Sequence, residues 1–153
     1  MSSKVHMAES IVINVAAEKI FDYISNGNND PKWRTEVDRM DVQGETQIGT
    51  VMVEYSSFYR FLHTVTPTKI KILDKPNKIV LETPANHPTW LQSIRTIKQI
   101  SNNECEVTYE LSFSIDSMKQ IIPFTPPVGL VTFWYSPRIK KYLKNLKQIL
   151  ENN

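Results

Sequence analysis

The stretch Ile11–Ile24, IVINVAAEKIFDYI, changes its hydrophobic period halfway along, and this change decides the fold. Apolar residues alternate over about residues 7–15, which predicts a strand with one buried face. Residues 17–24 then follow helical spacing, which predicts a short amphipathic helix. The Asn-rich segment 26–30 ends that helix, and Pro31 suits the first position of a second short helix.

From residue 37 onward the sequence predicts one strand after another. We expect strands at residues 39–45, 49–60, 61–73, 79–83, 90–100 and 105–115. The last of these has the clearest alternation, with one face formed by Cys105, Val107, Tyr109, Leu111, Phe113 and Ile115. A period of two over so many residues is typical of an antiparallel sheet with one buried and one solvent-facing side.

A long amphipathic helix is predicted at the other end of the chain, from about Val128 to Glu151. Its apolar stripe consists of Ile139, Leu143, Leu146 and Leu150. We expect a bend at Pro137, because proline removes a backbone donor and clashes with the preceding turn. The order of these elements predicts a sheet wrapped around a helix: one strand comes first, then two short helices, many strands and a closing helix.

These segments resemble the helix-grip (SRPBCC, START-like) superfamily, in particular its polyketide cyclase/dehydrase-like branch. The resemblance rests on residues 16–24, Pro31-Lys-Trp-Arg34, Ile48-Gly-Thr50 and residues 143–150. It implies an α+β helix-grip fold, with a curved antiparallel sheet of about seven strands around the C-terminal helix. It specifies a reaction poorly, because the group mixes carriers, cyclases and chaperone regulators.

Composition narrows the class of protein. The 153 residues, 41% hydrophobic and 22% charged, are expected to form a single domain over residues 1–153. A net charge of +2 gives no reason to expect nucleic acid as a partner, and no apolar run is long enough for stable membrane insertion.

The single cysteine and the lack of a signal-peptide pattern predict a cytoplasmic protein. A homodimer is possible, and no cofactor or metal is expected, because the three histidines have no metal-ligand spacing.

Three residues are candidates for catalysis, each with a structural alternative. His63 lies in a predicted strand and could act as a general base if it faces the space between the sheet and the C-terminal helix. Alternatively, it could be a structural or surface histidine. Arg95 could hold a carboxylate or enolate oxygen if it points inward, or it could face solvent. The Tyr109 hydroxyl could orient a ligand, or it could bond to the backbone in the core.

The candidate ligand-binding residues are mostly aromatic. They are Tyr55, His63, Trp90, Tyr109, Phe113, Phe124, Leu130, Phe133 and Trp134. The last four belong to the proline-broken apolar segment 121–135, which could border a cavity mouth, fill the core or form an exposed patch.

Three functions remain open at this point. The leading hypothesis is the binding of a small, largely hydrophobic ligand (a lipid, a polyketide or an aromatic metabolite) between the sheet and the C-terminal helix. The second is a polyketide cyclase/dehydratase-type enzyme with one acid/base in the cavity. The third is a protein-interaction module that uses the apolar segment 121–135.

Overall fold

The computed structural model describes residues 3–152, which form one seven-stranded sheet and five helical segments. The elements are, in chain order, β1 (Lys4–Ile13), α1 (Ala17–Ser25), η1 (Gly27–Asn29), α2 (Asp30–Trp33), β2 (Val37–Gln43), β3 (Val51–Phe58), β4 (Leu62–Asp74), β5 (Lys78–Glu82), β6 (Leu91–Ser101), β7 (Glu104–Ser114), η2 (Ile115–Gln120) and α3 (Val128–Glu151).

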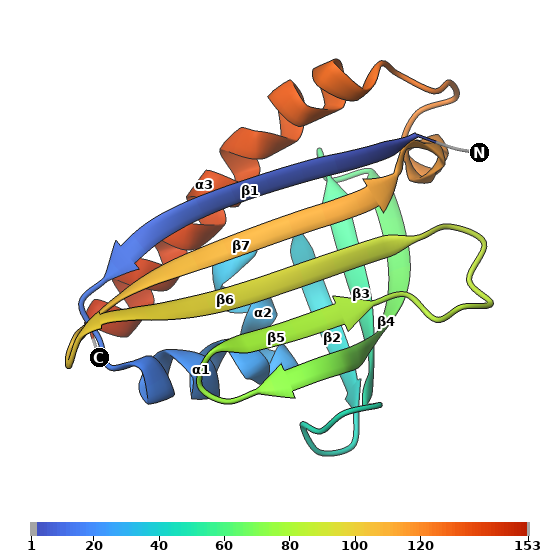
Figure 1. Cartoon of the computed structure of the whole chain (residues 1–153). Coiled ribbons are helices and arrows are strands. Elements are labelled where there is room, and N and C mark those ends of the chain that lie inside the picture. Colours follow the sequence, from blue (N-terminus) through green and yellow to red (C-terminus); the bar gives the residue numbers. More distant parts are fainter. Residues whose placement is uncertain (1–2, 153) are drawn as a thin grey trace.

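The sheet is antiparallel throughout and follows the order β1-β7-β6-β5-β4-β3-β2. Strands β2 to β7 therefore form a meander, and β1 joins its far edge beside β7. Figure 1 shows β1, β7 and β6 side by side, while β2 and β3 turn away from them at the other end of the sheet. A register shift between Ile70 and Ile72 in β4 contributes to this curvature, because an extra residue on one strand bends and twists the ladder.

The long helix α3 lies on the inner side of the curved sheet and packs mainly against β1 (Figure 1). Its buried side chains are Val131, Tyr135, Ile139, Tyr142, Leu143, Leu146 and Leu150. This set contains the whole apolar stripe predicted from the sequence. The structure therefore confirms the helix-grip fold.

The short helices cover one end of the space between the sheet and α3. Trp33 of α2 is completely buried, and its carbonyl accepts a hydrogen bond from Asn145 Nδ2 of α3 at 3.2 Å. Gly27 of η1 lies against β2 and β3, with no room for a side chain. These contacts hold α2 between the sheet and α3.

Most predicted elements are present with small shifts in their bounds. β1 begins at Lys4, three residues before the predicted start, because it pairs with β7 from Lys4↔Ser114 to Ile13↔Cys105. α3 runs without interruption through Pro137, which lies on its exposed side, so the unpaired carbonyl of Phe133 lies on the solvent side of the helix. Within residues 3–152, no helix is both long and apolar enough to span a membrane.

Candidate functional site

A cavity of about 90 Å³ lies between the inner face of the sheet and α3. One of its walls is polar and comes from β3 and β4, with the side chains of Glu54, Ser56, Thr64, Thr66 and Thr68. Another part of the lining is apolar and consists of Leu91, Leu111, Phe113, Met118, Ile121 and Tyr135. The cavity therefore has both polar and apolar lining.

The strand period explains which residues reach this cavity. Successive side chains of a strand point to opposite faces, so Glu54, Ser56 and Phe58 of β3 all face inward. The same rule turns Leu91, Ser93 and Arg95 of β6 to the inner face.

A buried network of ion pairs forms the deep end of the cavity. Asp30 Oδ2 accepts hydrogen bonds from Arg34 Nη1 at 2.9 Å and from Arg95 Nη2 at 2.5 Å. Arg95 Nη1 donates to Asp30 Oδ1 at 3.0 Å and to the carbonyl of Ile24 at 2.6 Å. The network therefore ties α2 to β6 and to the end of α1.

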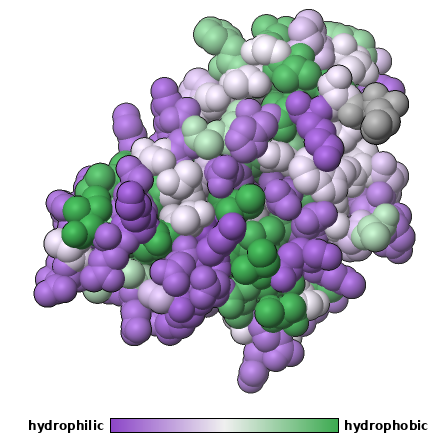
Figure 2. Space-filling model, in the orientation of Figure 1, coloured by the Kyte–Doolittle hydropathy of each residue, from purple (hydrophilic) through white to green (hydrophobic). Residues whose placement is uncertain are grey.

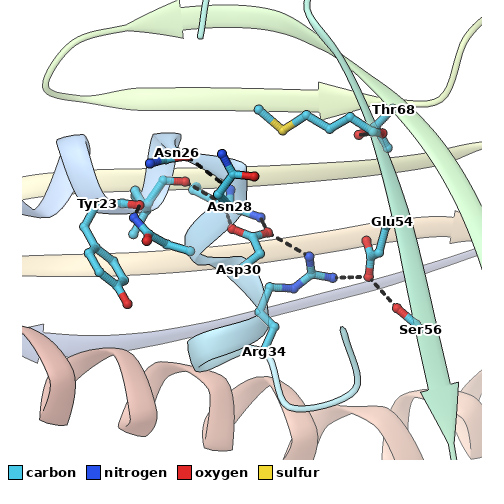
Figure 3. A network of polar contacts seen from close by, with 12 residues as sticks. Tyr23, Asn26, Asn28, Asp30, Arg34, Glu54, Ser56 and Thr68 are labelled. Atoms are coloured by element: carbon cyan, nitrogen blue, oxygen red, sulfur yellow. Dashed lines mark hydrogen bonds and ion pairs between the residues drawn. The ribbon is translucent and has the colours of Figure 1, made fainter. Parts of the chain in front are cut away.

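Arg34 extends the network to the polar wall. Its Nη2 donates to Glu54 Oε1 at 2.8 Å, and the Ser56 hydroxyl donates to the same oxygen at 2.8 Å. Figure 3 shows Arg34 between Asp30 and Glu54, with the second carboxylate oxygen of Glu54 free of any contact drawn. Arg34 thus fixes the position of Glu54.

The charges of this network balance, with two arginines and two carboxylates. The exposed fractions of the side chains are 1% for Asp30, 3% for Arg95, 7% for Arg34 and 16% for Glu54. Burial by itself lowers the pKa of Arg34, but Glu54, Tyr109 and Asp30 outweigh it and raise that pKa well above its ordinary value. Arg34 therefore stays charged at every pH at which the protein is folded.

Aromatic rings cover the guanidinium groups. The Tyr109 ring packs edge-on against Trp33, with centroids 5.9 Å apart, and against Tyr142 at 6.4 Å. The Cζ atoms of Arg34 and Arg95 each lie 5.8 Å from the Tyr109 centroid. Such cation–π contacts stabilise a charge that has lost its water.

Two further tyrosines stay protonated. Burial raises the pKa of both Tyr135 and Tyr142 far above the ordinary value of a phenol. Tyr135 lines the cavity, so it presents a neutral hydroxyl-bearing ring to a ligand.

Five buried polar atoms of residues that line the cavity lack a hydrogen-bond partner within residues 3–152. They are the hydroxyl oxygens Ser93 Oγ, Tyr109 Oη and Ser117 Oγ and the Nε atoms of Arg34 and Arg95. Because buried polar groups are nearly always paired in folded proteins, their unmet capacity is typical of a site that takes up water or a ligand.

An outer pocket of about 310 Å³ adjoins the cavity near the start of α3. Its lining is almost entirely apolar and consists of Tyr59, Leu62, Met118, Ile121, Ile122, Pro126, Leu130, Val131 and Trp134. Met118 and Ile121 line both spaces, so they form the wall between them. The two spaces therefore lie in series from the deep polar network toward the start of α3.

The turn between β3 and β4 covers one side of the outer pocket. The Tyr59 hydroxyl accepts hydrogen bonds from Trp134 Nε1 at 2.6 Å and from Arg138 Nη2 at 3.3 Å. The bond from Trp134 is the largest of the causes that lower the pKa of Tyr59. Tyr59 and Arg60 have left-handed backbone angles, with φ of 55° and 70°, so this turn is strained.

Large apolar side chains are exposed around this end of the molecule. Phe124 is 60% exposed, Leu130 is 58% exposed and Phe133 is 80% exposed. Figure 2 shows hydrophobic side chains at the upper edge of the view, over the start of α3, and further hydrophobic groups at the left edge and in the lower centre among hydrophilic side chains. The apolar segment 121–135 thus contributes both to the outer pocket and to the surface beside it.

The structure brings five of the predicted site residues to the two spaces. Arg95, Tyr109 and Phe113 line the cavity, while Leu130 and Trp134 line the outer pocket. Arg95 points inward, but Asp30 and the Ile24 carbonyl occupy both of its Nη atoms. Its Nε has no partner within residues 3–152, so the role of Arg95 as a holder of a ligand carboxylate stays a prediction.

The other predicted residues lie elsewhere. His63 is on the outer face of the sheet, where its Nδ1 lies 2.8 Å from Ser57 Oγ, and so it cannot be a base in the cavity. Tyr55 also faces outward, with Arg39 Cζ 3.9 Å above its ring. Trp90 is on the outer side as well and donates to Glu82 Oε1 at 3.0 Å. The alternation of side chains along a strand explains these corrections. Each of the three residues is next in sequence to one that lines the cavity, so its own side chain points to the opposite face of the sheet.

Phe124 and Phe133 also need correction, because neither lines the cavity or the outer pocket. Both side chains are exposed instead. Their helical or loop positions turn them to solvent beside the outer pocket. They belong to the exposed part of segment 121–135.

Sequence reasoning missed the residues with the strongest electrostatic interactions, namely Asp30, Arg34 and Glu54. The spacing of Asp30 and Arg34, four apart in a predicted helix, is a signal that could have indicated their pairing. Glu54 shares a strand face with Met52 and Phe58, and an ionisable residue on a buried strand face is a second signal. As for metals, no group of three or more His, Cys, Asp or Glu within residues 3–152 is arranged to hold one.

Comparisons with known proteins agree with this geometry. Residues 4–151 match the profile of the family described as polyketide cyclase / dehydrase and lipid transport. No protein with a curated description matches the chain.

Several solved structures share the fold at low sequence identity. A START superfamily protein from Mycobacterium smegmatis has a TM-score of 0.77 and 12% identity, with 96% of this chain and 97% of that chain covered. The Zhui aromatase/cyclase from Streptomyces sp. R1128 has a TM-score of 0.76 and 8% identity, with 97% and 94% covered.

The di-domain aromatase/cyclase StfQ from the steffimycin biosynthetic pathway has a TM-score of 0.74 and 11% identity. The alignment covers 97% of this chain and 51% of StfQ, so the chain spans about half the length of that relative. At such identities the structures show a shared fold, and the family match shows membership. The chain belongs to the polyketide cyclase/dehydrase and lipid transport family.

Proposed function

We propose that this protein binds a small, largely hydrophobic molecule, such as a lipid, a polyketide or an aromatic metabolite, in the cavity between the sheet and α3. The observation that carries the proposal is the pairing of an apolar wall with buried polar groups that have no partner. Ser93 and Tyr109 are such groups, and a bound molecule would complete their hydrogen bonding.

The two walls have different tasks in this proposal. Apolar surface removed from water contributes about 25 cal/mol per Å², so Leu111, Phe113 and Met118 would supply most of the affinity. A few fixed polar groups then orient the ligand, as is usual for small-molecule sites. Glu54 is held in place for this task by hydrogen bonds from Arg34 and Ser56.

Family membership supports the coarser statement, a role in ligand binding or cyclisation. The cyclase/dehydratase alternative is favoured by one observation. Glu54, with a free carboxylate oxygen, and the unpartnered hydroxyl of Tyr109 line the same cavity. A carboxylate and a hydroxyl on one cavity can move protons of a bound ligand, and fixed positioning lowers the barrier further.

A pair of neighbouring substitutions tests the proposal. Leu91 faces the cavity, whereas Gln92 faces outward and donates to Glu82 Oε2 at 3.2 Å. Leu91→Trp would fill the cavity, and Gln92→Trp would add the same ring on the outer face as the control. Titration with the neutral fluorescent probe N-phenyl-1-naphthylamine measures binding to each variant.

We expect saturable one-site binding to the wild type and to Gln92→Trp, and at least about tenfold weaker binding to Leu91→Trp. Equal affinity in Leu91→Trp, at an unchanged melting curve, would overturn the proposal. Native mass spectrometry of the gently purified protein then separates the two functions. A carrier releases a copurified molecule unchanged on incubation, while a dehydratase releases it lighter by one water.

A further inference from the structure

We infer that the deep end of the cavity selects ligands whose polar end donates hydrogen bonds, such as a hydroxyl or an ammonium group, and rejects ligands that end in a carboxylate. This inference rests on the proposed function and adds the class of ligand to it. The juxtaposition that carries it is a free carboxylate oxygen of Glu54 beside two arginines whose charges are balanced by Asp30 and Glu54 itself.

The arginines are the first step of the argument. Arg34 Nη1 and Nη2 bind Asp30 and Glu54, and both Nη atoms of Arg95 bind Asp30. The Nε atoms of both arginines are buried and have no partner in the described chain. Aromatic rings lie over the guanidinium groups, with the Trp33 centroid 5.0 Å from Arg95 Cζ. A ligand carboxylate would therefore meet guanidinium groups whose charges are already balanced by Asp30 and Glu54.

Glu54 is the second step. Its Oε1 accepts from Arg34 and Ser56, while its Oε2 accepts no hydrogen bond from the residues that the structure describes. Its side chain is 16% exposed, more than twice the 7% of Arg34. The most open charge on the cavity wall is thus negative. A ligand carboxylate placed there would meet a like charge, whereas a donor would complete the acceptor capacity of Glu54.

The remaining polar groups do not change this preference. The hydroxyls of Ser93, Tyr109 and Ser117 can either donate or accept, so they accommodate an alcohol as well as an acid. Among residues 3–152, Arg34 and Arg95 are the only basic residues that line the cavity, and their Nη atoms bind Asp30, Glu54 and the Ile24 carbonyl. Discrimination between ligands therefore falls to Glu54.

The outer pocket determines the other end of the ligand. It is apolar, measures about 310 Å³ and meets the cavity at Met118 and Ile121. A ligand with its polar end at Glu54 would pass these two side chains and bury an apolar tail in the outer pocket. The inferred class is therefore an elongated molecule with a donor at one end and an aromatic or aliphatic tail at the other.

Three probes that each carry a phenyl group on a four-carbon chain test this selection directly. They are 4-phenylbutylamine, 4-phenylbutanol and 4-phenylbutyrate, each used to displace N-phenyl-1-naphthylamine from the wild-type protein at neutral pH. We expect the amine and the alcohol to displace the fluorescent probe at concentrations at least about tenfold lower than the carboxylate. In Glu54→Gln the advantage of the amine and the alcohol over the carboxylate should shrink, whereas Glu82→Gln on the outer face should retain it.

The outcomes separate the inference from the proposed function. If 4-phenylbutyrate competes as well as the alcohol, or better, the selection by Glu54 is wrong while binding in the cavity stands. If the wild type does not bind N-phenyl-1-naphthylamine at all, the proposed function fails and the inference fails with it. The wild-type comparison of the three probes needs no variant, so instability of Glu54→Gln would not remove the test.

Discussion

At the scale of single residues, Asp30 organises the polar end of the cavity. It is fully buried and accepts hydrogen bonds from both Arg34 and Arg95. Arg34 in turn holds Glu54 in position. Because removing one partner of a buried ion pair leaves an uncompensated charge, Asp30 is the residue of this network to which stability is most sensitive.

We predict that Asp30→Asn lowers the free energy of unfolding by about 3–5 kcal/mol, because two buried guanidinium groups lose their shared carboxylate. Chemical denaturation measures the change. The matched control is Asp41→Asn, which breaks the exposed pair with Arg39 at 3.1 Å and should cost less than about 1 kcal/mol. Similar losses in the two variants would contradict the assigned role of Asp30.

At the scale of elements, the close approach of η1 to the sheet depends on Gly27. A Cβ atom there would lie 2.8 Å from Met52 Sδ, 3.0 Å from Val42 Cγ2 and 3.3 Å from Met40 Cγ. These three side chains belong to β2 and β3. Gly27 therefore lets the short helices pack directly on the strands that carry Glu54.

We expect Gly27→Ala to lower the free energy of unfolding by about 1–3 kcal/mol, since the added methyl group overpacks the contact with Met52. Gly129→Ala is the control, because a Cβ at Gly129 in the first turn of α3 meets nothing within 4 Å. That substitution should leave stability unchanged or raise it by up to about 1 kcal/mol. Thermal unfolding of both variants checks the difference, and a neutral Gly27→Ala would show that η1 can move away from the sheet.

At the scale of the whole molecule, the end of β1 and the end of α3 are tied together. Glu151 Oε2 accepts a hydrogen bond from the backbone N–H of Asn14 at 2.9 Å and another from Lys147. Lys147 Nζ also donates to the carbonyl of Val12 at 2.8 Å. These bonds thereby fix the end of α3 to the end of β1, at the side of the molecule opposite the outer pocket.

This closure makes stability depend on pH in a defined direction. The Asn14 bond and, after it, Lys147 lower the pKa of Glu151 in the folded protein. The carboxylate therefore stabilises the fold above its unfolded pKa, and that contribution is lost as pH falls through the lowered folded pKa. We predict that wild type is more stable than Glu151→Gln at neutral pH and that the difference disappears in acid.

Denaturant titrations at a series of pH values measure this difference. Glu45→Gln, in the exposed turn between β2 and β3, is the control and should differ from wild type by the same small amount at every pH. A difference for Glu151→Gln that persists unchanged into the acid range would show that its hydrogen bonds do not favour the charged form.

The sequence by itself determined the elements and most of their faces, because hydrophobic periods of two and about 3.6 residues are local properties of a chain. The predicted alternation of β7 is present in the structure, with Cys105, Val107, Tyr109, Leu111 and Phe113 all buried. The apolar stripe of α3 is buried as well.

The tertiary structure alone decided which polar residues line the cavity. Tyr55 and Glu54 are adjacent in β3, and the curvature and packing of the sheet determine which of them faces α3. Asp30 and Arg95 are 65 positions apart, so no local pattern could pair them. Their ion pair exists because the fold removes both charges from water together, and a buried charge must find its partner wherever the chain brings one.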